Sequence, residues 1–380
     1  MKYSIEIGKI VEGSLKHDQT KVINYTKQLI EKLKTDGENR AADKFRKILS
    51  TQSVSALSTT GYRSEMLVPV DTESRAVLAD VIYPSENNTA VILSNRNLED
   101  LQSFILSYKN ADKLNAAGVG VSNTLLLYGP PGCGKTQCAY YIARELQLPL
   151  VIARLDSLIS SYLGTTAKNI RTLFEFSQKV PCVLFLDEFD AIAKARDDSN
   201  ELGELKRVVN SLLQNVDSMS RDSLLLAATN HDTLLDSAVW RRFEYKLEID
   251  RPDIDAILKM IDLFTKNASG LTDKDKKDFA VALNGLTGAN IEEILLKAIR
   301  NAIVKGNEVK KKDYYEELFK FEEVLSQKDY SEREKLRLKA QFLRKCDEKV
   351  FSLQVIAEIL DSSKTTISKL IKEVNTNERT

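Results

Sequence analysis

The sequence is poor in the residue types that build disulfide, zinc and histidine-based sites. Its 380 residues include only four cysteines and two histidines. No two cysteines form a C-x-x-C pair. With only two histidines, neither a zinc site nor a histidine-based hydrolytic triad is expected. We therefore expect reduced thiols, as in a cytoplasmic protein, and no metal site built on cysteine or histidine. The four thiols are Cys133, Cys138, Cys182 and Cys346.

Long apolar runs and an excess of either charge are also missing. No apolar stretch approaches the roughly 20 residues that a membrane span requires, and the N-terminal segment MKYSIEIGK lacks the apolar core of a signal peptide. The 55 Lys and Arg residues balance 55 Asp and Glu residues, so bulk charge favours neither nucleic acid nor an anionic membrane as a partner. We expect a cytoplasmic protein without a membrane partner.

One stretch dominates what is present, Leu125–Thr136, which reads LLLYGPPGCGKT. Its apolar start predicts a buried strand, and Gln137–Leu146 after it has helical composition. Between them lies the phosphate-binding pattern G-x-x-x-x-G-K-[ST], whose backbone N–H groups turn toward phosphate oxygens where side chains would obstruct them. Lys135 supplies charge to the β- and γ-phosphates, and Thr136 a hydroxyl to Mg²⁺. The loop residues are Gly129, Pro130, Pro131, Gly132, Cys133, Gly134, Lys135 and Thr136.

A second apolar run ends in carboxylates. Val183–Asp190 reads VLFLDEFD, which predicts another buried strand with acidic residues at its carboxyl end. Ligands of open α/β sheets bind at that end of the strands. We therefore assign Asp187 to hold Mg²⁺ through water and Glu188 to orient the attacking water.

These motifs and five further segments resemble the ATPase module of the AAA family, in its subgroup of ring-forming protein remodellers. The similarity runs from about Val91 to Lys320, about 60% of the chain. It implies an α/β fold with a P-loop parallel-sheet core and an α-helical lid, ATP and Mg²⁺ as cofactors, and a homo-oligomer, a hexamer in the family's usual form. The segments are GPPGCGKT, YLG, LDEFDAIAKAR, ELKRVVNSLLQNVDS, AATN, LLDSAVWRRFE and GLTGAN.

The resemblance also implies roles for single residues. Asn230 positions the attacking water, while Arg241 and Arg242 reach the γ-phosphate of a neighbouring subunit. Gly288 and Ala289, in the segment GLTGAN, pack on the nucleotide. The alternative for the arginines is an ordinary surface charge pair.

Tyr162, Leu163 and Gly164 resemble the family's pore loop, which grips an extended polypeptide. An aromatic face binds many sequences, and glycine permits a tight loop. The alternative is a tyrosine packed at a strand end.

The two ends of the chain lie outside the resemblance. Apolar stripes predict helices at the N-terminus, as either a substrate-holding adaptor or a cap on the ring. Short strands are expected at Leu67–Val70 and Ala90–Ser94. The expected division is residues 1–50, a helical N-terminal region; 51–65, a flexible linker; 66–250, the α/β ATPase subdomain; 251–321, the lid; and 322–380, a helical C-terminal extension.

Residues 352–371 resemble a helix-turn-helix, with Asp361 at the turn position where glycine is usual. Two functions therefore remain open. The first is an ATP-driven remodeller that threads protein substrates; since no protease domain is expected in the chain, any degradation would need a separate peptidase as a partner. The second is a DNA-directed ATPase. Against DNA binding, residues 346–380 carry five Lys and Arg but six Asp and Glu.

Overall fold

The computed structural model divides the chain into two compact units. The first comprises residues 1–91, 97–129 and 135–249, and the second comprises 92–96, 130–134 and 250–380. Each is described by itself below. The structure describes residues 3–16, 18–52, 68–71, 75–83, 91–154, 158, 163–190, 204–220, 223–235, 237–266, 268, 270–322, 324 and 330–373.

The first unit contains a six-stranded sheet in the order β1-β3-β4-β5-β2-β6. Five strands run parallel, and β1 joins the edge antiparallel to β3. The central strands are buried throughout, as expected for parallel strands covered on both faces. The predicted α/β class with a parallel sheet is thus confirmed. The strands are β1 (Ala79–Ile82), β2 (Thr124–Tyr128), β3 (Leu150–Ala153), β4 (Val183–Leu186), β5 (Leu224–Thr229) and β6 (Tyr245–Glu248).

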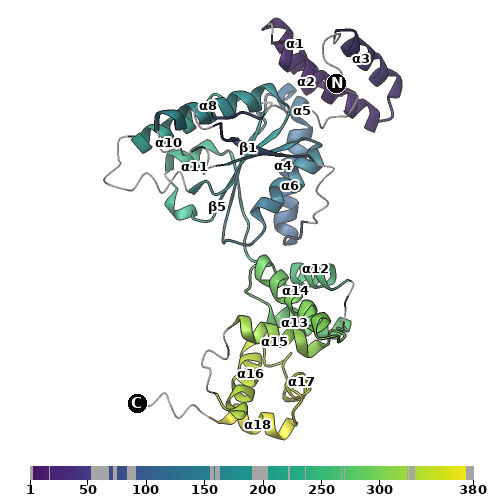
Figure 1. The fold of residues 1–380 in the computed structure, drawn as a ribbon, viewed down its shortest axis with the longest axis vertical. Helices are drawn as coiled ribbons and strands as arrows, with labels where there is room; N and C mark the ends of the chain where they lie inside the picture. The colour runs from purple at the N-terminus through teal and green to yellow at the C-terminus, as the bar shows by residue number, and fades with distance from the viewer. Residues whose placement is uncertain are drawn as a thin grey trace. The chain divides into compact units, whose positions relative to one another are not determined.

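Helices cover both faces of this sheet. Figure 1 shows α8, α10 and α11 on one side and α4 and α6 on the other. Leu126, Leu184 and Leu225 face the first group and share its core. On the other side, Phe104 of α4 packs against Tyr245 of β6, with ring centroids 5.4 Å apart. The helices are α4 (Asn95–Lys109), α5 (Ala111–Ala116), α6 (Lys135–Leu146), α8 (Leu163–Lys179), α10 (Glu204–Asp217) and α11 (Ser237–Arg242).

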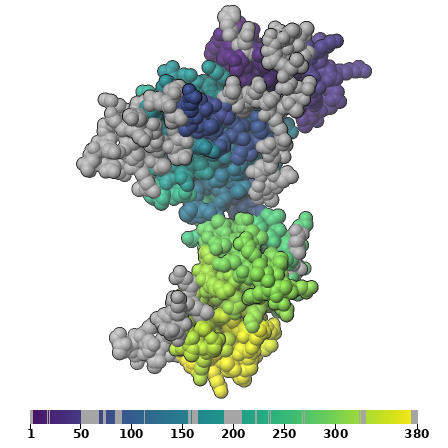
Figure 2. All heavy atoms as spheres, viewed as in Figure 1, coloured from purple at the N-terminus to yellow at the C-terminus, as the bar shows by residue number. Residues whose placement is uncertain are grey.

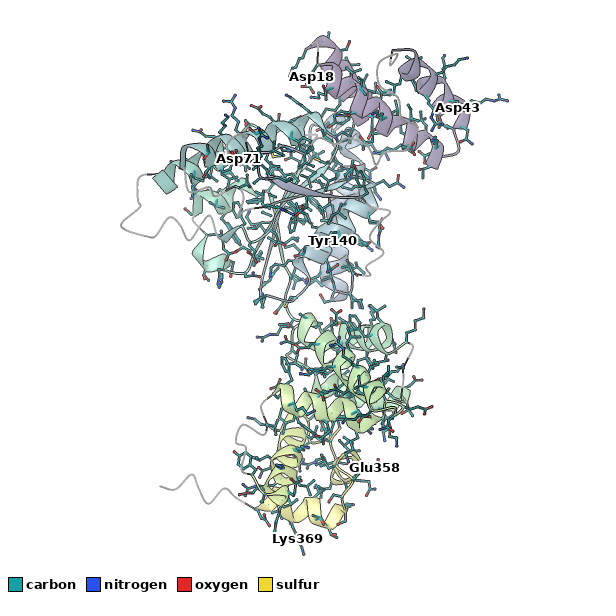
Figure 3. The ribbon with its side chains drawn as sticks, viewed as in Figure 1. Asp18, Asp43, Asp71, Tyr140, Glu358 and Lys369 are labelled. Atoms are coloured by element: carbon teal, nitrogen blue, oxygen red, sulfur yellow. The ribbon has the colours of Figure 1, made fainter. Side chains whose placement is uncertain are left out.

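Three N-terminal helices belong to the same unit: α1 (Ser4–Leu15), α2 (Gln19–Thr35) and α3 (Asn39–Gln52). Asp18, labelled in Figure 3, caps α2 by accepting a hydrogen bond from the Lys21 amide at 3.0 Å. Lys9 of α1 is fully buried, and its ammonium donates to Ser220 Oγ at 2.9 Å. This bond is a specific polar contact between the N-terminal helices and the rest of the unit. Figure 2 shows these helices in purple against the teal part of the unit.

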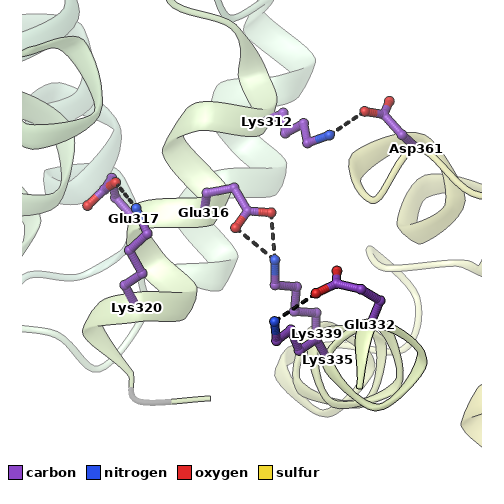
Figure 4. Close-up of polar contacts among 8 residues, drawn as sticks. All are labelled: Lys312, Glu316, Glu317, Lys320, Glu332, Lys335, Lys339 and Asp361. Atoms are coloured by element: carbon purple, nitrogen blue, oxygen red, sulfur yellow. Dashed lines mark hydrogen bonds and ion pairs between the residues drawn. The ribbon is translucent and has the colours of Figure 1, made fainter. Parts of the chain in front are cut away.

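The second unit is helical and has one continuous core. Tyr315 packs its ring against Phe279 and Phe351, so the predicted lid and the C-terminal extension share buried aromatic residues. Ion pairs reinforce this contact: Lys312 with Asp361 at 2.6 Å and, in Figure 4, Glu316 with the ammonium of Lys339. The helices are α12 (Ile254–Thr265), α13 (Asp273–Ala282), α14 (Gly288–Val304), α15 (Lys311–Phe321), α16 (Glu332–Cys346), α17 (Leu353–Ile359) and α18 (Lys364–Lys372).

Two expected short strands were placed wrongly. Residues 91–94 are not a strand, and from the segment 67–70 only Val70 makes a single bridge, to Val77. The edge strand is instead β1, which extends the sheet by pairing with β3. Most of the expected linker, residues 53–65, lies outside the described residues. Within the described part of the chain, no helix is both long and apolar enough to cross a membrane.

Candidate active site

Three adjacent strands end in polar or glycine residues at one edge of the sheet. Asp187 follows β4, Asn230 follows β5 and Gly129 follows β2. Because β5 lies between β4 and β2, with Leu186 opposite Ala227 and Tyr128 opposite Thr229, Asn230 comes between Gly129 and Asp187. This is the edge where parallel sheets bind ligands.

Asp187, the first residue of the acid pair, is held in place by Thr136, which follows Lys135 in the loop. Thr136 Oγ1 donates to Asp187 Oδ2 at 2.9 Å, and the Glu188 amide donates to Asp187 Oδ1 at 2.9 Å. Asp187 is thus held at both oxygens, while the side chain of Glu188 is exposed. Glu188 has a φ of 51°, a left-handed conformation that costs roughly 1–3 kcal/mol and clusters at functional sites. This left-handed residue lies two positions after the end of β4.

The lysine of the loop is buried at the start of α6. Lys135 is 6% exposed, and its Nζ donates to the Gly129 carbonyl at 2.7 Å. Gly129 has a φ of 135°, and a Cβ atom there would lie 2.3 Å from the carbonyl oxygen of Ile249. Only glycine fits this position, so the tight turn that the pattern predicts is present.

Residues 130–134 of the loop belong to the second unit, where they contact the start of α14. The Ala289 amide donates to the Gly132 carbonyl at 3.0 Å. A Cβ atom on Gly288 would lie 3.3 Å from the same carbonyl, and one on Gly132 3.0 Å from Ala289 Cβ. Gly288 and Ala289 therefore allow close packing on the loop backbone. In this arrangement the Ala289 amide already has a partner in Gly132.

The two arginines of α11 differ in their surroundings. Arg242 donates from Nε and Nη2 to Asp217, both at 3.1 Å, and from Nη1 to the Ala238 carbonyl at 3.1 Å. Arg241 is exposed and makes no polar contact with any side chain that the structure describes. The sequence-based prediction gave both arginines the same role. It did not single out Asp217, whose carboxylate binds Arg242 and so makes the surroundings of the two arginines different.

Two acceptors near the acid pair were also missed. Asp190 is 7% exposed, and its Oδ2 lies 3.8 Å from His231 Nε2. Thr229 is fully buried and accepts a hydrogen bond from the His231 amide at 3.0 Å. The fourth residue of the run DEFD was the available signal for Asp190. Tyr162 lies outside the described residues, and Leu163 and Gly164 are described only as the backbone that begins α8.

Comparison with known proteins agrees with this geometry. The family described as "ATPase family associated with various cellular activities (AAA)" matches residues 125–251. An uncharacterized AAA family ATPase of Sinorhizobium fredii is 44% identical over 243 residues, which are 64% of this chain and 73% of that protein. The chain belongs to the AAA family. It is accordingly an ATPase.

Other AAA relatives are matched over less of their length. The proteasome-activating nucleotidase of Methanococcus vannielii is 33% identical over 247 residues, 63% of this chain and 60% of that protein. The chloroplastic ATP-dependent zinc metalloprotease FTSH of Nicotiana tabacum is 34% identical over 206 residues, 52% of this chain and 29% of that protein. The chain thus spans less than two thirds of these two relatives.

The residues present fit an AAA nucleotide site. Among the described residues no three acidic, histidine or cysteine side chains cluster as a metal site. Thr136 and Asp187 place two oxygen donors 2.9 Å apart, the ligand type that Mg²⁺ prefers beside phosphate oxygens and water. Cys138, on α6, is not a reactive group, because burial raises the pKa of its thiol to about 12.

Proposed function

We propose that this AAA ATPase assembles into a homo-oligomeric ring, a hexamer, and uses Mg²⁺-dependent ATP hydrolysis to unfold or remodel protein substrates. The observation that carries the proposal is the split arginine pair of α11, which lies away from the chain's own P-loop: the Arg242 carbonyl accepts a hydrogen bond from Thr124 at the start of β2, whereas Gly129 follows the end of that strand. Arg242 is anchored to Asp217 in its own subunit, whereas Arg241 is exposed. An exposed arginine at this position suits a neighbour's nucleotide.

Within one subunit each group has a distinct task. Gly129 and the loop after it surround the phosphates, and Lys135 turns from the Gly129 carbonyl to the β- and γ-phosphates. Asp187 and Thr136 would hold Mg²⁺, which when bound would supply positive charge beside the phosphates. Glu188 accepts a proton from the attacking water, and Asn230 orients that water by donating and accepting hydrogen bonds.

Protein remodelling is the proposed use of this energy. One relative is named a proteasome-activating nucleotidase and another an ATP-dependent zinc metalloprotease. The 380 residues here contain two histidines and no H-E-x-x-H zinc pattern. Because the sequence lacks this zinc pattern, we propose that any degradation is carried out by a separate peptidase in the cytoplasm. We also propose that Tyr162, Leu163 and Gly164 grip an unfolded substrate.

Replacing Glu188 with glutamine tests the proposal. The amide cannot accept the proton, so ATP turnover and unfolding of a tagged substrate should fall by at least about 100-fold. Nucleotide binding should persist, because Lys135, Thr136 and Asp187 are unchanged, and a stable ATP-bound oligomer should accumulate on size-exclusion chromatography with light scattering. Glu244→Gln, an exposed carboxylate at the opposite end of the sheet, is the control and should retain turnover. Near-normal hydrolysis by Glu188→Gln would contradict the assignment.

A DNA-directed role remains a second candidate because the extension has helix-turn-helix features. Asp361 has a φ of 49°, the left-handed turn for which glycine is usual, between α17 and α18. Ile367 and Leu370 of α18 are buried, whereas Lys364, Lys369 and Lys372 are exposed, Lys369 pointing outward in Figure 3.

Titrating labelled duplex DNA at two salt concentrations tests this role. Binding that weakens steeply with salt and disappears in a Lys364, Lys369 and Lys372 to Ala triple variant would establish it. DNA affinity that is the same in the triple variant as in the wild type would exclude α18 as the DNA contact.

A further inference from the structure

Helix α1 has charged residues on its inner side and three of its aliphatic residues on its outer side. Glu6 is 3% exposed and Lys9 is 1% exposed, whereas Ile7, Val11 and Leu15 are 37%, 52% and 77% exposed. A surface helix normally turns its apolar stripe toward the core and its charges toward water. In α1 this arrangement is reversed, so the outer face has the composition of a contact surface.

Polar partners outside the helix hold the charged residues of α1 inward. The pairs are Glu6 with Lys32 at 2.6 Å, Lys9 with Ser220 at 2.9 Å and Glu12 with Lys21 at 2.8 Å. Rotating α1 to bury its aliphatic residues would break these bonds, and a buried charge that loses its partner is strongly destabilising. The outward position of the aliphatic residues is therefore fixed by the way α1 docks.

The outer face of α1 is uncharged and has the same pattern in both directions. Every residue of α1 is described by the structure, and the five exposed ones carry no charge. Ile7 and Leu15, both aliphatic, lie four residues on either side of Val11, while Gly8 and Ser14, both small, lie three residues on either side. Residues three and four apart share one face of a helix. Reversing the helix about Val11 therefore places aliphatic over aliphatic residues and small over small ones.

This symmetry selects a second copy of the chain as the occupant of the face. In a two-fold contact a surface meets itself, and a charged surface would then repel its own copy. The outer face of α1 avoids that repulsion. Its small residues, Gly8 and Ser14, allow two helices to approach toward the short end of the usual interaxial range of about 8–10 Å. An unlike partner would require no symmetry about Val11.

We propose that α1 packs antiparallel on α1 of a second copy of this chain, about a two-fold axis beside Val11. Val11 then lies against the partner's Val11, and Ile7 against the partner's Leu15. A two-fold contact closes at two chains, so it joins chains in pairs and cannot by itself build a ring. It is a separate contact from the one that the arginines of α11 make in the proposed ring, and it requires no nucleotide.

Disulfide trapping in the full chain, without nucleotide, tests the proposal. At a chain concentration of about 100 µM, contacts with dissociation constants up to about that value are populated. Oxidised Val11→Cys should give at least about fivefold more disulfide-linked dimer on a non-reducing gel than Ile48→Cys, because thiols beside the axis come within the Cβ–Cβ reach of about 3.5–4.5 Å. Ile48 of α3 is the matched control, since it is 53% exposed and Val11 is 52% exposed.

The chain's own thiols contribute little to this trapping. Three of the four are buried, and burial raises the pKa of the fourth, Cys346, to about 11. The wild type, oxidised in parallel, measures what remains. Dimer from Val11→Cys that does not exceed dimer from Ile48→Cys would overturn the proposal.

A mixture of Ile7→Cys and Leu15→Cys chains, one of them tagged so that the three dimers differ in size, tests the antiparallel direction. The mixed dimer should exceed the two self-paired dimers together by at least about threefold, because Ile7 faces the partner's Leu15. Adding Val11→Glu to both chains should reduce the mixed dimer, since two carboxylates then meet at the axis, and Val11→Glu in one chain with Val11→Lys in the other should restore it. Self-paired dimers as abundant as the mixed one, or trapping unchanged by Val11→Glu, would overturn the proposal.

Discussion

The arginine pair yields the most discriminating prediction. Arg241→Ala should reduce the ATP turnover of the assembled protein by about 10³–10⁵-fold, because an arginine supplied to a neighbour's γ-phosphate is worth that much. Arg242→Ala should cost far less. Its bond to Asp217 joins two partly exposed groups, 32% and 51% exposed, which limits the pair to about 1 kcal/mol, or roughly fivefold.

Mixing variants provides the assay. Arg241→Ala subunits keep an intact P-loop, and Lys135→Ala subunits keep an intact arginine. In an equal, randomly assembled mixture about one quarter of the head-to-tail interfaces combine both intact groups, so turnover should recover to about a quarter of the wild-type value. Arg171→Ala, an exposed arginine on α8, is the control and should stay near wild type. No recovery in mixtures that exchange subunits, or a larger defect in Arg242→Ala than in Arg241→Ala, would refute the reasoning.

Two further predictions concern stability. Phe351→Ala should lower the free energy of unfolding of the second unit by about 3–5 kcal/mol, because this fully buried ring joins the lid to the extension. Val304→Ala, 80% exposed, should change it by less than about 0.5 kcal/mol. Urea unfolding checks both, and hydrogen exchange should then rise in α13–α15 and α16–α18 together; loss of protection in the extension alone would contradict a shared core. Hydrogen bonds from Lys16 and Lys21 lower the pKa of Glu12 to about 2, so its contribution is complete above pH 4.5 and disappears as the pH falls toward 2. Glu12→Gln should remove this acid sensitivity in urea unfolding at pH 5 and pH 2. The effect should be less than about 1 kcal/mol, because solvent screens a side chain that is 34% exposed; equal pH dependence of both proteins would contradict it.

The strands that carry the site were predictable because each is a short apolar run that ends in a polar or glycine residue. The apolar start of Leu125–Thr136 and the run Val183–Leu186 emerge as β2 and β4 within about one residue of the prediction. Gly129 was predictable for a similar reason, since its role depends on local backbone geometry. Where periodicity and local conformation decide the structure, the sequence alone was sufficient.

Contacts between distant segments could not be predicted. β1 is a four-residue edge strand that is defined by its pairing with β3 rather than by its own pattern. The bond between Arg242 and Asp217 joins residues 25 positions apart, and the contact between Ala289 and Gly132 joins a helix start to a loop far earlier in the chain. Such features follow from tertiary packing, which no local pattern encodes.

Tyr162→Ala tests most directly the proposal that ATP hydrolysis drives polypeptide past Tyr162. Unfolding of a tagged fluorescent protein should be lost while basal ATP turnover and the melting temperature stay near wild type, because the loop acts after hydrolysis. Tyr162→Phe, which keeps the aromatic face, should retain unfolding. Unchanged unfolding by Tyr162→Ala, or a loss of about 3–5 kcal/mol of stability as for a buried aromatic residue, would contradict the threading mechanism.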